Sequence, residues 1–122
     1  MRYLHAFALA ALISAMGCGA SAIERKLGVK VYPGAKLTAS GNSATLHTAS
    51  FETNAPLSQV DAFYAKELGP NAARTFRTST QGDEGVRFIW DKATGERIVV
   101  VIVQRKQSGP TQLLMSHQLP KQ

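Results

Sequence analysis

The sequence predicts an α+β domain of two layers, in which one main helix packs on a mainly antiparallel sheet of five or six strands. Two observations support this prediction. Apolar residues between 57 and 68 repeat at helical spacing, as an amphipathic helix requires. Residues 74–118 instead form short apolar runs separated by turns that contain Gly, a pattern typical of an antiparallel meander. We expect one domain over residues 23–122.

The first element after residues 1–22 is predicted to be a strand over Leu27–Tyr32, because Val29 and Val31 would lie on the same face of it. It leads into Tyr32-Pro33-Gly34-Ala35. Pro33 fixes its own φ angle and Gly34 accepts the positive φ that follows, so these four residues predict a type II turn.

A hairpin is expected next, with strands Lys36–Ser40 and Ala44–Thr53 on either side of a turn at residues 41–43. The main helix follows it. Asn54 is the expected N-cap with Pro56 near the first turn. The helix should end at Gly69-Pro70, since a glycine suits the C′ position and the proline cannot continue the helix. Its apolar stripe consists of Leu57, Val60, Phe63, Tyr64 and Leu68.

Four more strands are expected in the second half, over Arg74–Thr80, Val86–Asp91, Arg97–Gln104 and Thr111–Gln118. Ile98–Val103 is an uninterrupted run of β-branched residues, which favours a central strand covered on both faces. Charges bracket this run, and such charges limit aggregation of a hydrophobic strand.

Residues 1–22 have the order of a bacterial export signal: a basic residue, Arg2, then an apolar stretch over 6–16, then small residues. Two cleavage sites are compatible with it. Cleavage after Ala22 would leave Ile23 first. Cleavage before Cys18 would follow a sequence that resembles a lipobox and would make Cys18 the lipidated first residue. Cys18 is the only cysteine, and lipidation would remove an odd thiol from an oxidising compartment, which favours the lipoprotein.

Three segments resemble a small exported bacterial protein family that includes many lipoproteins: residues 31–35, Phe51-Glu52-Thr53 and residues 60–68. The resemblance implies export and an α+β fold, and it transfers no catalytic residue. By similarity to such lipoproteins, Gly19 after the cysteine indicates the outer membrane, with the domain in the periplasm.

No catalytic signature is visible in the sequence, so we predict neither an enzyme nor a cofactor. The two histidines after the signal, His47 and His117, lie on strands that could pair. With Glu52 or Asp91 they could bind a transition metal, although two isolated strand histidines are the favoured interpretation and no metal site is predicted. Asp83-Glu84 lies in a turn, where adjacent carboxylates are usually solvated.

The chain carries 14 Lys and Arg against 8 Asp and Glu, a formal charge of +6. Basic charge alone does not indicate nucleic-acid binding, and no recognition motif accompanies it. Several basic residues lie on predicted neighbouring strands and could bind lipid or polysaccharide phosphate, unless they are only a solvated surface. The candidates for an anion site are Arg74, Arg77, Arg87, Arg97, Arg105 and Lys106.

These observations predict a non-catalytic accessory protein of the cell envelope, anchored to the membrane through Cys18 and interacting with an envelope protein. The alternative is an anion-binding module that uses the strand arginines. Trp90 could anchor a partner, but in a domain of this size it is expected to pack under the helix.

Overall fold

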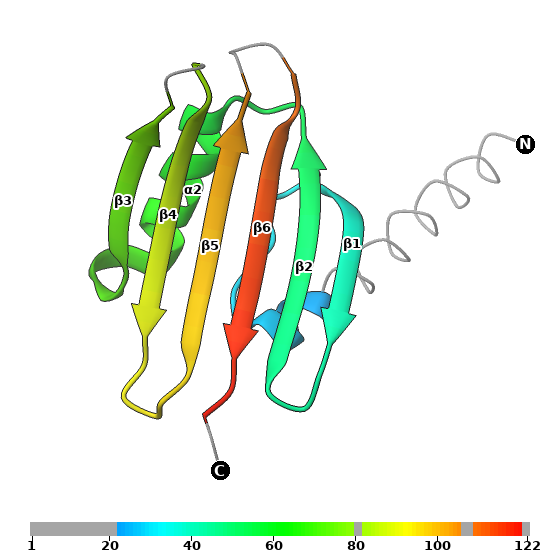
Figure 1. Ribbon diagram of the computed structural model, residues 1–122, viewed down its shortest axis with the longest axis vertical. Coiled ribbons are helices and arrows are strands. Elements are labelled where there is room, and N and C mark those ends of the chain that lie inside the picture. The colour runs from blue at the N-terminus through cyan, green and yellow to red at the C-terminus, as the bar shows by residue number, and fades with distance from the viewer. Residues whose placement is uncertain (1–21, 80–81, 106–108, 121–122) are drawn as a thin grey trace, which may run out of the picture.

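The computed structural model describes residues 22–79, 82–105 and 109–120. Six antiparallel strands form one sheet in the order β1-β2-β6-β5-β4-β3, with the helix α2 on one of its faces (Figure 1). The predicted two-layer α+β architecture is therefore confirmed. The elements are β1 Lys36–Asn42, β2 Leu46–Thr53, α2 Leu57–Leu68, a 3-10 turn Gly69–Asn71, β3 Ala73–Thr78, β4 Glu84–Asp91, β5 Arg97–Gln104 and β6 Thr111–Gln118.

The strand predicted over Leu27–Tyr32 is wrong. Residues 22–27 are helical, and Gly28 ends this helix with a φ of 73° while its N–H donates to the Glu24 carbonyl (2.8 Å). The Glu24 carboxylate accepts a hydrogen bond from the Val31 N–H (2.8 Å). Leu27 and Val31 are both buried against the sheet, so the apolar spacing reflects contact with the core and not strand pairing.

The type II turn after this segment has the predicted form. The Ala35 N–H donates to the Tyr32 carbonyl (3.0 Å), and Gly34 has a φ of 83°. The hairpin that follows is also present, but β1 continues to Asn42 and the turn occupies residues 43–45. The register shifts between Leu37 and Ala39.

The helix α2 begins at Leu57, which is later than an N-cap at Asn54 would place it. Pro56, with extended backbone, is the N-cap, and Asn54 is not. The Leu57 N–H instead donates to the side-chain oxygen of Gln104 on β5 (3.0 Å), so a neighbouring strand satisfies the helix end. Gly69 ends the helix with a φ of 57°, as predicted.

The meander β3–β4–β5–β6 follows the predicted order. The bounds of β5 and β6 match the predicted ranges, whereas β3 and β4 differ from theirs by one or two residues. The β-branched run is central, but only one of its faces is fully buried: Ile98, Val100 and Ile102 face α2, and the alternating valines remain partly exposed. The expectation of cover on both faces is wrong for the described residues, because no described element packs on the second face.

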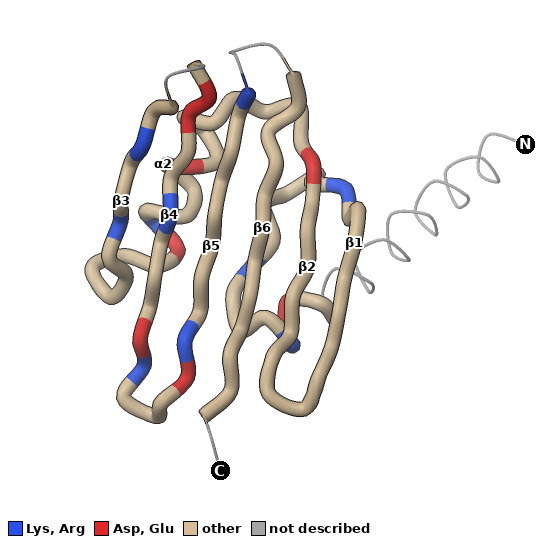
Figure 2. The backbone as a smooth tube through the Cα atoms, viewed as in Figure 1, with Lys and Arg blue, Asp and Glu red and all other residues tan. Residues whose placement is uncertain are grey.

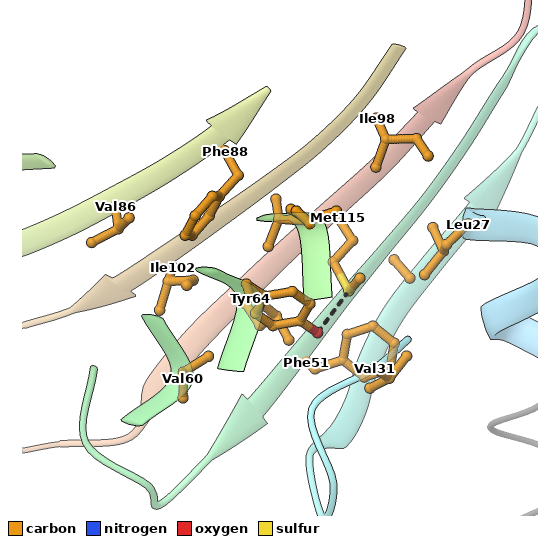
Figure 3. Close-up of a cluster of buried hydrophobic side chains, with 14 of the residues drawn as sticks. Leu27, Val31, Phe51, Val60, Tyr64, Val86, Phe88, Ile98, Ile102 and Met115 are labelled. Atoms are coloured by element: carbon orange, nitrogen blue, oxygen red, sulfur yellow. Dashed lines mark hydrogen bonds between the residues drawn. The ribbon is translucent and has the colours of Figure 1, made fainter. Parts of the chain in front are cut away.

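The core lies between the sheet and the segments 22–35 and 57–68 (Figure 3). Tyr64 is at its centre and fully buried. Its hydroxyl donates to the Lys30 carbonyl (2.9 Å), accepts from the Tyr32 N–H (2.9 Å) and lies 3.8 Å from the Met115 sulfur. Trp90 packs at the margin of this core, with the Lys92 Nζ 4.5 Å from its ring centroid.

Candidate functional site

The face of the sheet opposite α2 has no described element packed on it. We call it the open face, and Figure 1 views the sheet from this side. Side chains alternate along each strand, so the pairing register defines which residues project from it. Its middle row crosses all six strands in the order Thr75, Arg87, Val101, Leu114, Ser50 and Ala39.

Only some of the predicted anion-site residues lie together on the open face. Arg74 faces α2 instead, where its guanidinium forms an ion pair with Asp61. Arg97 is on the open face but pairs with Asp91 (Nε to Oδ1, 2.6 Å). These pairs raise the pKa of both arginines and lower that of Asp91, because each bond favours the charged form.

Arg105 lies beyond the end of β5, and Lys106 lies outside the described residues. The six predicted cations therefore do not gather into one patch. Figure 2 shows the basic positions spread over several strands, while β6 has no Lys, Arg, Asp or Glu.

Arg77 and Arg87 are the two strand arginines that remain. Both are exposed, and within the described residues neither guanidinium has an acidic partner. Arg77 is opposite Gly85 and Arg87 is opposite Thr75, so the two arginines occupy diagonal positions on neighbouring strands. Such positions are about 7–8 Å apart, within reach of long side chains.

These two arginines flank a depression of about 240 Å³, whose wall also includes Thr75, Gly85 and Val101. We call it the arginine depression. Gly85 has no side chain to fill it. A Cβ there would come no closer than 3.6 Å to its nearest neighbour, the Ile102 carbonyl oxygen. The space is therefore left by the glycine itself, with no tight backbone packing that demands it.

Two further depressions continue across the open face. The first, of about 210 Å³, is lined in part by Val99, Val101 and Leu114, so it shares Val101 with the arginine depression. The second, of about 220 Å³, shares Leu114 and Ser50 with the first and reaches Glu52. We call Val99, Val101 and Leu114 the apolar track. Leu114 is 43% exposed.

The two histidines lie next to each other, as the predicted pairing of their strands allowed. His47 and His117 are register partners on the face towards α2, with ring centroids 6.3 Å apart. The suggested metal ligands Glu52 and Asp91 project from the other face, so that ligand set is wrong. Among the described residues, no group of three or more His, Cys, Asp or Glu is arranged to hold a metal ion.

His117 instead joins residues 22–35 to the sheet. Its Nδ1 is 2.8 Å from the Lys26 carbonyl oxygen and its Nε2 is 2.6 Å from the Glu96 carboxylate. Both partners are acceptors, so a ring nitrogen of His117 that carries a proton can donate to one of them. Hydrogen bonds from the Thr94 hydroxyl and from His117 lower the pKa of Glu96. This cluster fastens the fold and leaves no ring nitrogen for a ligand.

Comparison with known proteins gives no match among family models, curated proteins or solved structures. The resemblance to small exported proteins therefore stays a prediction. Cys18 and the rest of the export signal lie outside the described residues. No helix in the described part of the chain is long and apolar enough to span a membrane.

Sequence reasoning found Arg77 and Arg87 but missed the residues that make a site around them. Thr75, Gly85 and Val101 each have an ordinary role in a strand, and only the register places them beside the arginines. The one local signal was Gly85, because a glycine inside a strand often marks a place where another group approaches closely.

Proposed function

We propose that this protein is a non-catalytic accessory protein of the bacterial cell envelope that binds its partner through the open face. The observation that carries the proposal is the open face itself. It combines exposed apolar side chains with two arginines that have no acidic partner among the described residues. Exposed apolar surface with a polar rim is typical of an interaction site.

Export and anchoring form the second part of the proposal. Cys18 is its lipidated residue, and the protein is held at the outer membrane with the domain in the periplasm. Gly19, Ala20 and Ser21 separate Cys18 from residue 22, where the described helix begins. Four residues reach at most about 14 Å when fully extended, so an anchored domain would stay close to the lipid surface.

Anion binding is the second candidate, and a specific observation supports it. Arg77 and Arg87 converge on one depression with the Thr75 hydroxyl beside them. Arginine pairs are suited to phosphate and carboxylate because each guanidinium offers a planar fork of donors. The other arginines on the strands, Arg74 and Arg97, are already neutralised by ion pairs.

Site-specific photo-crosslinking in intact cells would test the open face as the binding surface. A photo-reactive residue replaces Leu114, which is exposed on the open face, and a matched control replaces Lys66, which is exposed on α2. We expect a reproducible adduct with one envelope component from position 114 and none from position 66. Equal adducts from both positions, or none from position 114, would contradict the proposal.

A further inference from the structure

We infer that the open face binds an anionic lipid, with its phosphate between Arg77 and Arg87 and its acyl chain along the apolar track. This inference rests on the proposed function of the open face and specifies the ligand. It requires three properties of the surface: a cation pair that is free to bind, an apolar path that starts beside it, and a charge distribution that fixes the direction of the lipid.

The cation pair is free in the described structure. Two guanidiniums from diagonal positions, together with the Thr75 hydroxyl, present more donors than one carboxylate can accept. A phosphate has oxygens on several sides and can accept from both arginines and the hydroxyl at once. Gly85 leaves the space in which such a group would sit.

The apolar path starts at the same place. Val101 lines both the arginine depression and the next one, and the path then crosses β5 and β6 at Val99 and Leu114. Neighbouring strands are about 4.8 Å apart, so the distance from β4 to β2 is about 14 Å. An acyl chain lying along it would cover leucine and valine side chains that water now contacts.

The direction is set by charge. At the far end of the path, Glu52 lies opposite Lys36 on β1, so the two charges balance. The two arginines without an acidic partner among the described residues are at the β3–β4 end. An anionic head group is therefore favoured beside Arg77 and Arg87 and an uncharged chain beyond them.

A lipid fits the open face better than a second copy of this chain. Six strands of six to eight residues present an area on the order of 600 Å², from the usual strand spacing and rise. A standard protein–protein interface buries about 600–1,000 Å² on each partner, so a second copy would have to cover the whole face, including both unpaired arginines. A single lipid needs only the path between the arginines and Leu114.

The test measures binding to the full exported chain, purified and held in nanodiscs of phosphatidylcholine. Dihexanoyl phosphatidic acid, inorganic phosphate and dihexanoyl phosphatidylcholine are titrated separately by calorimetry, with empty nanodiscs subtracted. We expect phosphatidic acid to bind at least tenfold more tightly than either of the other two probes, because inorganic phosphate has no acyl chain for the track and the choline of phosphatidylcholine neutralises the charge of its phosphate.

Variants locate the site. The double variant Arg77→Gln/Arg87→Gln should weaken phosphatidic acid binding at least tenfold, and Gly85→Leu should weaken it similarly by filling the depression. The matched control is Arg97→Gln, which removes one positive charge from the same face but from a residue already paired with Asp91. It should change the affinity less than twofold. Unchanged melting temperatures would show that the exposed substitutions leave the fold intact.

Four outcomes would overturn the inference. Inorganic phosphate that binds as tightly as phosphatidic acid would indicate a simple anion site. An equal loss in Arg97→Gln would indicate diffuse charge. Sedimentation of a dimer that Leu114→Ser dissociates would indicate a second copy. No binding of phosphatidic acid would remove the lipid as the ligand. The proposed function is refuted separately, by a crosslinking result in cells that gives no adduct at position 114 or equal adducts at positions 114 and 66.

Discussion

Removing one oxygen from the core should show how strongly residues 22–35 are held to α2. The change is Tyr64→Phe. The Tyr64 hydroxyl bonds to the Lys30 carbonyl and the Tyr32 N–H, and it lies beside Met115 (Figure 3). Phenylalanine keeps the ring in its place but leaves these two backbone groups without their partner.

The expected loss of stability follows from that geometry. Leaving a buried donor or acceptor unsatisfied costs about 1–3 kcal/mol in the free energy of unfolding. Urea unfolding at pH 7 would measure it, and the slope of the free energy against urea should stay the same because the core keeps its shape. Tyr32→Phe is the matched control, since Tyr32 is only partly buried. A loss below about 0.5 kcal/mol would mean that water replaces the hydroxyl and the reasoning is wrong.

The same variant also gives a prediction at alkaline pH, where its loss of stability relative to the unsubstituted protein should become smaller. Burial raises the pKa of the Tyr64 phenol well above its usual range, and the hydrogen bond from the Tyr32 N–H only partly opposes this. A raised pKa in the folded state stabilises the protein fully below the unfolded value of about 10, and this stability declines as the pH rises further. The advantage over Tyr64→Phe should therefore shrink by about 1.4 kcal/mol per pH unit above 10. A gap that stays constant up to pH 11 would refute the assignment.

Three further predictions concern the Glu96 carboxylate, the turn at Gly34 and the lipid anchor at Cys18. Glu96→Gln should destabilise the protein at neutral pH, because the hydrogen bonds from Thr94 and His117 favour the ionised carboxylate. The difference in stability should disappear as the pH falls below 4.5 through the lowered pKa of Glu96, and acid unfolding curves would show it. A difference that persists in acid would argue against an ionised Glu96 bonded to Thr94 and His117. Gly34→Ala should cost about 1 kcal/mol because of the positive φ, with no clash, and urea unfolding would register it. The intact mass of protein extracted from membranes should correspond to an acylated chain that starts at Cys18, and an unmodified start at Ile23 would exclude the anchor.

The parts of the fold that could be predicted depend on neighbours in the sequence. The apolar stripe of α2 and the β-branched run of β5 are periodic over a whole element, so their type followed directly from spacing. The strand predicted over residues 27–32 was wrong because contacts with the core outweighed a short alternation of apolar residues. Leu27 and Val31 pack on the sheet, and Gly28 ends a helix between them.

The missed helix cap has the same origin. Asn54 was the predicted cap, but Gln104 supplies the acceptor from a strand 47 positions away. No local rule can supply that partner, because it exists only once β5 lies beside α2. Tertiary contacts of this kind replace the expected side-chain cap while satisfying the same orphan backbone group.

The candidate site was predictable only as a set of cations. Strand alternation already separated Arg74 from Arg77, and the register confirms that they face opposite sides. Which arginines stay unpaired could not be predicted, because Asp61 reaches Arg74 from α2 across 13 positions. Ion pairs with Asp61 on the α2 side and with Asp91 on the open face thus leave Arg77 and Arg87 as the strand arginines without an acidic partner among the described residues.

The position of Arg77 has a second explanation besides ligand binding, and an experiment can separate the two explanations. Arg77 lies on β3, an edge strand, and a charge on an exposed edge discourages pairing with another chain. A charge of either sign provides that protection, whereas only a cation binds a phosphate. Arg77→Glu should therefore remain soluble and monomeric while losing the lipid. If it aggregates instead, its positive charge serves the edge, and the exposed guanidinium is not evidence for a ligand.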